Sequence, residues 1–388
     1  MLRSRPEEER PRRSMQETFV DLMRGDPAPR FQAATASNPR YIFDTVAGRY
    51  VVLCFFVSGG TPGGAAALAA VAANRHRFDD ERLCFFGITV DPRDRDAGRV
   101  EQSLPGVRFF LDFDGSVSRS YGAVPREVVA GGQVNARQFW VVLDPTLRVL
   151  EVIPFKPGGA ECAPLFAFLD GLPPPHLHAG QLLQAPVLFL PGVFEPGFCR
   201  HLIGLHEADG GRDTGFMNDV GGKTVEVVDP ARKRRRDFVV EDENVILAAQ
   251  GRIKRRIVPE IARLFFFDAT RIERYLVGCY TEEDGGHFAA HRDNTTRGTA
   301  HRRFAVSINL NDDFDGGEVS FPEYGPRGFK PPVGGAVVFS CSLMHAVSAV
   351  TRGRRYAFLP FLYDEAAARI RAANNQFLDP SIGTYKST

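Results

Sequence analysis

Two short segments carry side chains whose types and spacing suit metal binding. Residues 279–294 place His291 and Asp293 two positions apart on a predicted strand. Because side chains alternate along a strand, these two point to the same face. A second apolar strand, 336–341, leads into His345. Two neutral imidazoles and one carboxylate on one side of a metal leave its other side open, so an Fe(II) ion there could hold both a co-substrate and dioxygen.

An arginine follows the second histidine and could bind an acidic co-substrate. The segment Gly353-Arg354-Arg355-Tyr356 comes shortly after His345. A guanidinium is a planar, permanent cation that can meet both oxygens of a carboxylate at once. Arg355 is therefore predicted to stand at the far end of the site, as a fixed charge for a dicarboxylate.

The order of the flanking motifs resembles that of a known enzyme superfamily. Tyr280 leads into the His-x-Asp strand, an apolar strand follows at 304–311, and Gly316-Gly317-Glu318 resembles a Gly-Gly-Glu turn before a further strand. A lone His-x-Asp would be weak evidence, because surface strands also carry such pairs. With the whole set in order, residues 186–388 resemble the Fe(II)/2-oxoglutarate dioxygenase superfamily, specifically its prolyl 4-hydroxylase-like branch.

The resemblance implies a jelly-roll (double-stranded β-helix) domain and a role for each residue of the set. His291, Asp293 and His345 would hold Fe(II), and 2-oxoglutarate would chelate the metal through its keto-acid end. The distal carboxylate of 2-oxoglutarate would pair with Arg355. Tyr280 would donate a hydrogen bond to the co-substrate or to the substrate.

One further position is included in the co-substrate site. Asn309 and Leu359 stand where some relatives place a hydroxyl that touches the co-substrate. Both residues are departures from the family pattern at positions that the resemblance places beside the co-substrate. We therefore count Asn309 among the residues expected to bind 2-oxoglutarate.

The resemblance also implies a reaction. Dioxygen would be the second co-substrate, 2-oxoglutarate would become succinate and CO2, and an unactivated C–H bond would be hydroxylated, with ascorbate as a further cofactor to test. This branch favours a prolyl residue of a peptide or protein as the substrate. A free amino acid or a natural-product intermediate remains an alternative, since one fold and metal centre serve many substrates. A thiol-redox protein and a non-catalytic sensor of metal or co-substrate are the other two classes considered.

The remaining histidines of this region have no partner in the metal-binding pattern. His287 precedes the central positions of its strand, and His201, His206 and His301 stand apart from the motif. A solvated or hydrogen-bonded imidazole is the simpler interpretation of each.

Length and charge favour a soluble enzyme with two domains. A chain of 388 residues exceeds the size at which one core keeps growing. A net charge of +1 gives no general attraction to nucleic acid or to acidic membranes. Residues 1–19 mix arginine and glutamate without the apolar stretch of a secretory signal, so we predict a disordered tail and a cytoplasmic protein. The six cysteines form no close pairs, which predicts free thiols.

Residues 20–172 alternate strand and helix signals, which predicts an α/β sheet. Continuous apolar runs indicate buried strands at 50–57, 82–90, 107–111 and 139–143. The order of elements resembles a thioredoxin-fold peroxiredoxin. Such a domain could dock a substrate, form a homodimer or cap the catalytic domain.

The peroxiredoxin resemblance lacks the reactive thiol. Where that family places its peroxidatic cysteine, three residues after Thr61, this chain has Gly64. Peroxide reduction needs a thiolate, and glycine has no sulfur. Arg137 lies one residue out of register with the family's catalytic arginine, and the nearest thiols, Cys54 and Cys84, fall inside apolar strands. We therefore predict a peroxiredoxin-like domain, beginning its helix at Pro62, without peroxidase chemistry.

A proline-rich linker is predicted at 173–185, before the oxygenase-like domain at 186–388. That domain is expected to open with a strand at 186–190 and a helix at 196–207. A second helix is predicted at 243–267 from apolar residues at helical spacing. Pro259 should kink or reset it.

Two runs of positive charge need separate consideration. Residues 232–236 precede a strand-like segment, and residues 252–256 lie on the predicted second helix. A run of charge is most often a solvated face. Nucleic-acid binding would favour aromatic residues among the charges, and neither run contains one. The functional alternative is a rim that attracts an acidic substrate to the iron.

Overall fold

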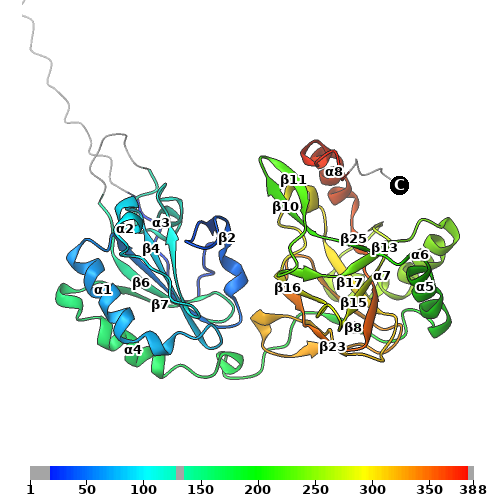
Figure 1. The fold of residues 1–388 in the computed structure, drawn as a ribbon, viewed down its shortest axis with the longest axis horizontal. Coiled ribbons are helices and arrows are strands. Elements are labelled where there is room, and N and C mark those ends of the chain that lie inside the picture. Colours follow the sequence, from blue (N-terminus) through cyan, green and yellow to red (C-terminus); the bar gives the residue numbers. More distant parts are fainter. Residues whose placement is uncertain (1–17, 128–134, 383–388) are drawn as a thin grey trace, which may run out of the picture. The chain divides into compact units, whose positions relative to one another are not determined.

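The computed structural model describes residues 18–127 and 135–382, so nearly all of the predicted tail lies outside the described residues. The chain divides into two compact units, Met1–His178 and Ala179–Thr388, each with its own sheets and helices (Figure 1). The division falls inside the predicted linker. Within the described ranges, no helix is long and apolar enough to cross a membrane.

The first unit is built on a five-stranded sheet with the order β5-β4-β3-β6-β7. Its strands are β3 (Tyr50–Val57), β4 (Leu83–Thr89), β5 (Val107–Leu111), β6 (Phe139–Leu143) and β7 (Val149–Pro154). Strands β5, β4 and β3 are parallel to one another, whereas β6 runs antiparallel to β3 and β7 runs antiparallel to β6. The apolar runs of the sequence thus form the buried centre of a mixed sheet. A small hairpin precedes it, with β1 (Gln32–Ala33) and β2 (Tyr41–Ile42).

Helices and aromatic side chains cover the two faces of this sheet. The helices are α1 (Pro62–Ala73), α2 (Pro92–Asp96), α3 (Ser116–Tyr121) and α4 (Cys162–Asp170) (Figure 1). Ala67 of α1 and Leu165 of α4 share a core with Trp140 of the sheet. On the other face, Phe86 and Phe110 stack with ring centroids 4.9 Å apart. Both faces of the sheet are therefore shielded from water, which explains why apolar residues do not alternate with polar ones along these strands.

The second unit contains two larger antiparallel sheets. One has the order β14-β25-β17-β24-β15-β13-β9, with β21 paired to both β17 and β8. Its strands are β8 (Leu188–Leu190), β9 (Arg212–Asp213), β13 (Arg236–Val239), β14 (Arg271–Glu273), β15 (Leu276–Thr281), β17 (Phe304–Asn309), β21 (Ala336–Ser340), β24 (Arg354–Phe358) and β25 (Phe361–Tyr363). The other has the order β12-β16-β22-β19-β20. Its strands are β12 (Lys233–Arg234), β16 (His287–His291), β19 (Val319–Ser320), β20 (Gly328–Phe329) and β22 (His345–Val347).

A hairpin, a pair of two short strands and a C-terminal helix are further elements of the second unit. They are the hairpin of β10 (Phe216–Val220) and β11 (Lys223–Val227), the pair β18 (Asp315–Gly316) and β23 (Val350–Arg352), and α8 (Glu365–Asn374). Figure 1 shows β10 and β11 extending beyond the sheets.

Three helices pack against one face of the larger sheet: α5 (Pro196–Asp209), α6 (Glu243–Arg256) and α7 (Val258–Phe265) (Figure 1). The helix predicted at 243–267 is two helices, because Pro259 lacks the N–H that a continuous helix would need and instead lies in the first turn of α7. Ile253 and Ile261 still face one core with Phe358 of the sheet. The helical spacing therefore predicted the buried face, and the proline decided the break.

Alternation along the strands divides this sheet into an outer and an inner face. On β24, Tyr356 and Phe358 pack with the helices, whereas Arg355 lies on the opposite face. On β15, Val277 and Cys279 face the helices, and Tyr280 packs in a second cluster with Val337 and Phe339. The same cluster also contains Val319, Phe321, Cys341, Leu343 and Val347. These come from both sheets, so the inner face encloses the candidate site.

Candidate metal centre

Three potential metal ligands meet at the ends of two neighbouring strands. His291 is the last residue of β16, His345 is the first of β22, and the two are directly paired across the antiparallel ladder. Asp293 follows β16, and its two oxygens lie 3.5 Å from His291 Nε2 and 3.4 Å from His345 Nε2. One donor atom from each residue lies within 4.8 Å of the others. The structure thus brings together the three residues that the sequence analysis singled out.

Backbone carbonyls orient both imidazoles. His291 Nδ1 lies 2.8 Å from the Ala289 carbonyl, and His345 Nδ1 lies 3.0 Å from the Leu343 carbonyl. A carbonyl can only accept, so each Nδ1 carries the hydrogen and each Nε2 keeps a lone pair directed toward Asp293. These orienting groups were not identifiable from the sequence, because backbone contacts leave no residue signature.

Electrostatics sets two of the three groups, Asp293 and His345, in the protonation states that suit a cation. Burial, reinforced by the nearby His291, lowers the pKa of His345 to about 4, so its imidazole is neutral at pH 7. Burial opposes ionisation of Asp293, but His345 and His291 outweigh it and hold the pKa of that carboxyl well below its usual range. Aromatic rings lie beside both imidazoles. The ring centroids of Phe288 and His291 are 3.5 Å apart, and those of Phe339 and His345 are 4.6 Å apart. The result is an ionised Asp293 beside a neutral His345 in an apolar surrounding.

Arg355 lies in the interior of the same unit and has one unused donor. It is only 1% exposed, and burial lowers its pKa from the ordinary value. Its Nε and Nη2 donate to Asn309 Oδ1 at 3.1 and 3.0 Å, and Nη2 also donates to Ser307 Oγ at 2.7 Å. Its Nη1 is buried without a hydrogen-bond partner. An unpaired buried guanidinium donor is costly, so this geometry fits an acidic ligand.

Asn309 holds Arg355 in place. Its side-chain oxygen accepts from Arg355, and its Nδ2 donates to the Pro331 carbonyl at 2.9 Å. Both ends of the amide are therefore engaged with protein. The expected contact of Asn309 with the co-substrate stays a prediction, whereas its contact with the arginine is present. Ser307, which the sequence analysis missed, is two residues earlier on the same strand face.

Tyr280 and Arg355 are direct partners across β15 and β24. The Arg355 Cζ lies 5.3 Å from the centre of the Tyr280 ring, and the side chain of Tyr280 is only 2% exposed. The Tyr280 hydroxyl accepts a hydrogen bond from Arg235 Nη1 at 3.3 Å. A second arginine that the sequence did not single out thus contacts this site.

The interpretation of residues 232–236 as a solvated face is wrong for two of its five residues. Lys233 and Arg235 are buried, at 6% and 7% exposure, whereas Arg234 and Arg236 are exposed. Strand alternation accounts for this pattern, because the segment spans β12 and the start of β13. Aromatic rings of neighbouring strands contact both buried cations: Lys233 lies over Phe288, and Arg235 lies over Tyr280.

The second basic run, 252–256, ties helices together. Arg252 Nε donates to Glu195 Oε2 at 2.6 Å, and Arg256 pairs with the same carboxylate. Arg256 Nη1 also donates to the Val193 carbonyl at 2.5 Å. These contacts connect α6 to the start of α5, which is a structural role.

Three of the other histidines, His206, His287 and His301, make hydrogen bonds away from the three ligands. His301 is fully buried and bonds Glu273, which also accepts from Arg302 at 2.8 Å. His206 Nε2 lies 3.2 Å from the Arg236 carbonyl, and His287 Nδ1 lies 2.8 Å from the Gly285 carbonyl. These contacts agree with the hydrogen-bonded interpretation.

In the first unit, the loop before α1 occupies the space that a reactive side chain would need. A Cβ placed on Gly64 would lie 2.1 Å from the Ser58 carbonyl oxygen, far inside van der Waals contact. The Gly64 N–H donates to Thr61 Oγ1 at 3.1 Å, and the Thr61 hydroxyl donates to Ser58 O at 2.8 Å. Val57 begins the loop with φ of +68°, a conformation that a β-branched residue rarely adopts.

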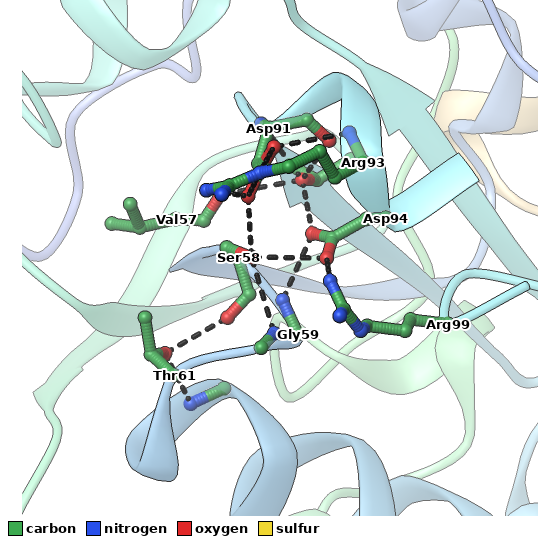
Figure 2. Close-up of polar contacts among 11 residues, drawn as sticks. Val57, Ser58, Gly59, Thr61, Asp91, Arg93, Asp94 and Arg99 are labelled. Atoms are coloured by element: carbon green, nitrogen blue, oxygen red, sulfur yellow. Dashed lines mark hydrogen bonds and ion pairs between the residues drawn. The ribbon is translucent and has the colours of Figure 1, made fainter. Parts of the chain in front are cut away.

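The carboxylates of Asp94 and Asp91 are hydrogen-bonded to this loop, as Figure 2 shows. The Ser58 hydroxyl lies 2.9 Å from Asp94 and 3.0 Å from Asp91. Asp94, which is fully buried, also accepts from the Gly59 N–H at 2.9 Å and from Arg99 at 3.2 Å. The loop is therefore a filled, hydrogen-bonded structure.

Arg137 and the nearest thiols, Cys54 and Cys84, are not placed for peroxide chemistry. Gln138, not Arg137, faces the loop: its Nε2 lies 2.7 Å from the Phe56 carbonyl and 3.3 Å from Thr61 Oγ1. Arg137 pairs with Asp21 at the surface. Cys54 and Cys84 are fully buried, and burial raises the pKa of the Cys84 thiol to about 12. All six cysteines of the chain are free.

Comparison with known proteins finds one family match in each unit. Residues 275–363 match the sequence model of the 2OG-Fe(II) oxygenase superfamily, and residues 24–150 match that of the AhpC/TSA family. The first match contains all three potential metal ligands, Tyr280 and Arg355. The AhpC/TSA match thus lies in the first unit, and the 2OG-Fe(II) oxygenase match lies in the second.

Individual relatives cover only part of the chain. A PKHD-type hydroxylase of Pseudomonas fluorescens (strain Pf0-1) is 40% identical over 91 residues, which make up 21% of this chain and 39% of the relative. The chain thus spans about two fifths of the length of that curated relative. A prolyl hydroxylase structure from Trichoplax adhaerens, solved with a hypoxia-inducible-factor peptide fragment, aligns with 48% of this chain and 86% of its own, at 17% identity and a TM-score of 0.38. Peroxidoxin BcpB from Mycobacterium tuberculosis aligns with 39% of this chain and 99% of its own, at 20% identity and a TM-score of 0.33.

Proposed function

We propose that the second unit is an Fe(II)- and 2-oxoglutarate-dependent dioxygenase on a double-stranded β-helix (jelly-roll) scaffold, and that it hydroxylates an unactivated C–H bond. The substrate we propose is a prolyl residue of a peptide or protein, with succinate and CO2 as co-products. Dioxygen is the second co-substrate. Ascorbate belongs among the additives to test.

One combination of observations carries this proposal. His291, Asp293 and His345 converge within 4.8 Å, and the same interior holds a buried Arg355 whose Nη1 lacks a partner. Two imidazoles and a carboxylate suit Fe(II) with open coordination positions. A buried, unsatisfied guanidinium donor suits the distal carboxylate of 2-oxoglutarate. A protein that used either feature alone would have no reason to retain both.

Each residue then has a distinct task. His291, Asp293 and His345 would hold the iron, which supplies the activation of dioxygen that no side chain could provide. The carbonyls of Ala289 and Leu343 fix both Nε2 atoms toward the metal. Asn309 and Ser307 fix the guanidinium of Arg355, so that its free N–H is already oriented when the co-substrate arrives. Phe288 and Phe339 keep water away from the reacting groups.

The substrate part of the proposal is supported by the names of the relatives. The matched curated relative is a PKHD-type hydroxylase, and the Trichoplax structure is a prolyl hydroxylase with a peptide fragment. A free amino acid or a natural-product intermediate is the alternative substrate class. Thiol peroxidation is disfavoured by the filled space at Gly64. A homodimer through the first unit stays a prediction.

The test is an anaerobic titration of the protein with Fe(II) and 2-oxoglutarate, followed by the weak visible charge-transfer band of the chelated complex. We expect a band in the wild type only when both are present, and none in Asp293→Ala. Asp315→Ala, which removes an exposed carboxylate paired with Arg352, is the matched control and should keep the band. A wild type without a band would contradict the proposal. With a band, a screen would begin with prolyl peptides and continue with free amino acids.

A further inference from the structure

Arg235 is buried in the second unit, although nothing in the sequence pattern gave it a role. The inward residues of its segment are Lys233, Arg235 and Asp237, with exposures of 6%, 7% and 3%. Moving a guanidinium out of water is costly unless its hydrogen bonds are replaced. The question is therefore which protein groups replace the hydrogen bonds that Arg235 would make with water.

The guanidinium of Arg235 is held by a carboxylate in a two-point contact. Its Nε and Nη2 donate to the two oxygens of Asp237 at 2.5 and 2.8 Å. Asp237 is itself bonded by the Thr214 hydroxyl. Lys233 Nζ donates to Thr214 Oγ1 at 2.7 Å and to the Gly215 carbonyl at 2.6 Å. Asp237 thus fixes the orientation of the Arg235 guanidinium, and the remaining Nη1 points toward Tyr280.

The bond from Arg235 determines what the Tyr280 hydroxyl can do. A guanidinium only donates, so Tyr280 Oη must be the acceptor of the 3.3 Å contact with Arg235 Nη1. The hydroxyl hydrogen then remains for another acceptor. Arg355, whose Cζ is 5.3 Å from the same ring, also has a donor without a partner in Nη1. Two spare donors on neighbouring buried side chains match the two oxygens of one carboxylate.

We propose that Arg235 is a positioning residue for co-substrate binding: by donating to Tyr280, it makes the tyrosine hydroxyl a donor that shares the distal carboxylate of 2-oxoglutarate with Arg355. This inference rests on the proposed function. Without Arg235, the Tyr280 oxygen is free to accept from Arg355 Nη1, so that this N–H is engaged with the tyrosine in place of the ligand. The affinity for 2-oxoglutarate falls, whereas iron binding does not involve these groups.

The experiment measures the dissociation constant of 2-oxoglutarate from the charge-transfer band of the Fe(II)-loaded protein, together with the melting temperature. In Arg235→Met the dissociation constant should rise by about tenfold to a hundredfold, the range of a hydrogen bond that involves a charged group. Tyr280→Phe should have a similar effect. The variant carrying both substitutions should bind 2-oxoglutarate no more weakly than Tyr280→Phe alone, because Arg235 acts through that hydroxyl.

Two further variants separate this role from a structural one. Arg235→Met leaves Asp237 buried without its partner, so Arg235→Met with Asp237→Leu removes both charges and protects the fold. Its dissociation constant should rise as in the single variant. Arg234→Met, which changes the exposed neighbour of Arg235, should bind as the wild type does.

The possible outcomes separate the two proposals. Unchanged affinity in the Arg235 variants, or effects of Arg235 and Tyr280 that simply multiply, would mean that Arg235 supports the fold only. Either result overturns this inference and leaves the proposed function standing. A wild-type protein with no band at all overturns both.

Discussion

The metal centre of the second unit and the loop before α1 of the first unit differ in how they use interior space. Around His291, Asp293 and His345, donor atoms converge and backbone carbonyls turn both imidazoles toward a common point. Around Gly64, the Ser58 carbonyl fills the position that a side chain would occupy. One interior retains unsatisfied polar atoms, and the other has bonded its polar groups to one another.

This difference suggests a criterion for a ligand-binding site: it contains buried polar atoms without a protein partner, whereas a purely structural region does not. Buried polar groups in a purely structural region find partners, as Asp94 does with Ser58, Gly59 and Arg99. A group such as Arg355 Nη1, which is buried and unpaired, has a cost that a ligand can offset. The comparison makes predictions for both regions.

The largest effect is expected from the metal ligands. His291→Ala should reduce succinate production by more than about 100-fold, since even residues that only orient metal ligands contribute roughly 10–100-fold. The melting temperature should stay near that of the wild type, because the imidazole lies at the end of β16. His287→Ala, at the other end of the same strand, is the control. Succinate production at the wild-type rate in His291→Ala would refute the assignment of this site.

The next effect concerns Arg355. Arg355→Leu should raise the 2-oxoglutarate concentration needed for half-maximal turnover by about 10- to 100-fold, because it removes a charged hydrogen bond of about 1.5–3 kcal/mol. Fe(II) binding should change little. Arg354→Leu removes an exposed arginine paired with Glu283 and should leave the requirement unchanged. An equal shift in both variants would mean that overall charge, and not the buried guanidinium, sets co-substrate affinity.

The filled loop predicts that a cysteine introduced at position 64, where peroxiredoxins carry their reactive thiol, is inactive. Gly64→Cys should show no hydroperoxide reduction and should be less stable by about 1–3 kcal/mol, the usual cost of overpacking. For a unit of this size, that corresponds to about 2–4 °C in melting temperature per kcal/mol. Gly171→Cys adds a thiol at an exposed position with only ordinary contacts and serves as the control. Peroxidase activity in Gly64→Cys would show that the loop opens easily, and the contrast between the two regions would be lost.

The smallest effect concerns the pH dependence of stability. Burial, with Arg235 nearby, lowers the pKa of Lys233 to about 6, against about 10.4 for an unfolded lysine. Between these values the unfolded chain binds more protons, so the free energy of unfolding should rise with pH by up to about 1.4 kcal/mol per unit. Lys233→Met should remove this slope in denaturant titrations at pH 6.5 to 8.5, roughly the accessible part of that window. The exposed Lys254→Met is the control, and an unchanged slope in Lys233→Met would show that another group causes it.

Much of the fold was predictable, because it depends on local pattern. Apolar runs predicted the strands from Tyr50–Val57 to Phe139–Leu143, and helical spacing predicted the buried face of α6 and α7. The break between these helices was expected at Pro259, since proline lacks the N–H that a continuous helix requires. The β10–β11 hairpin was not anticipated, because its strands are polar and half-exposed.

For the candidate site, the sequence by itself determined the identity of the residues with the rarest chemistry: His291, Asp293, His345 and Arg355 stand in a spacing that few other structures require. Only the tertiary structure decided which ordinary residues support them. Ser307, Asn309 and Arg235 acquire their roles from strands that are distant in the chain, and the Ser58 carbonyl closes the space at Gly64. The physical reason is that ligand type is a local property of a side chain, whereas burial and hydrogen-bond partners are set by packing between segments far apart in sequence.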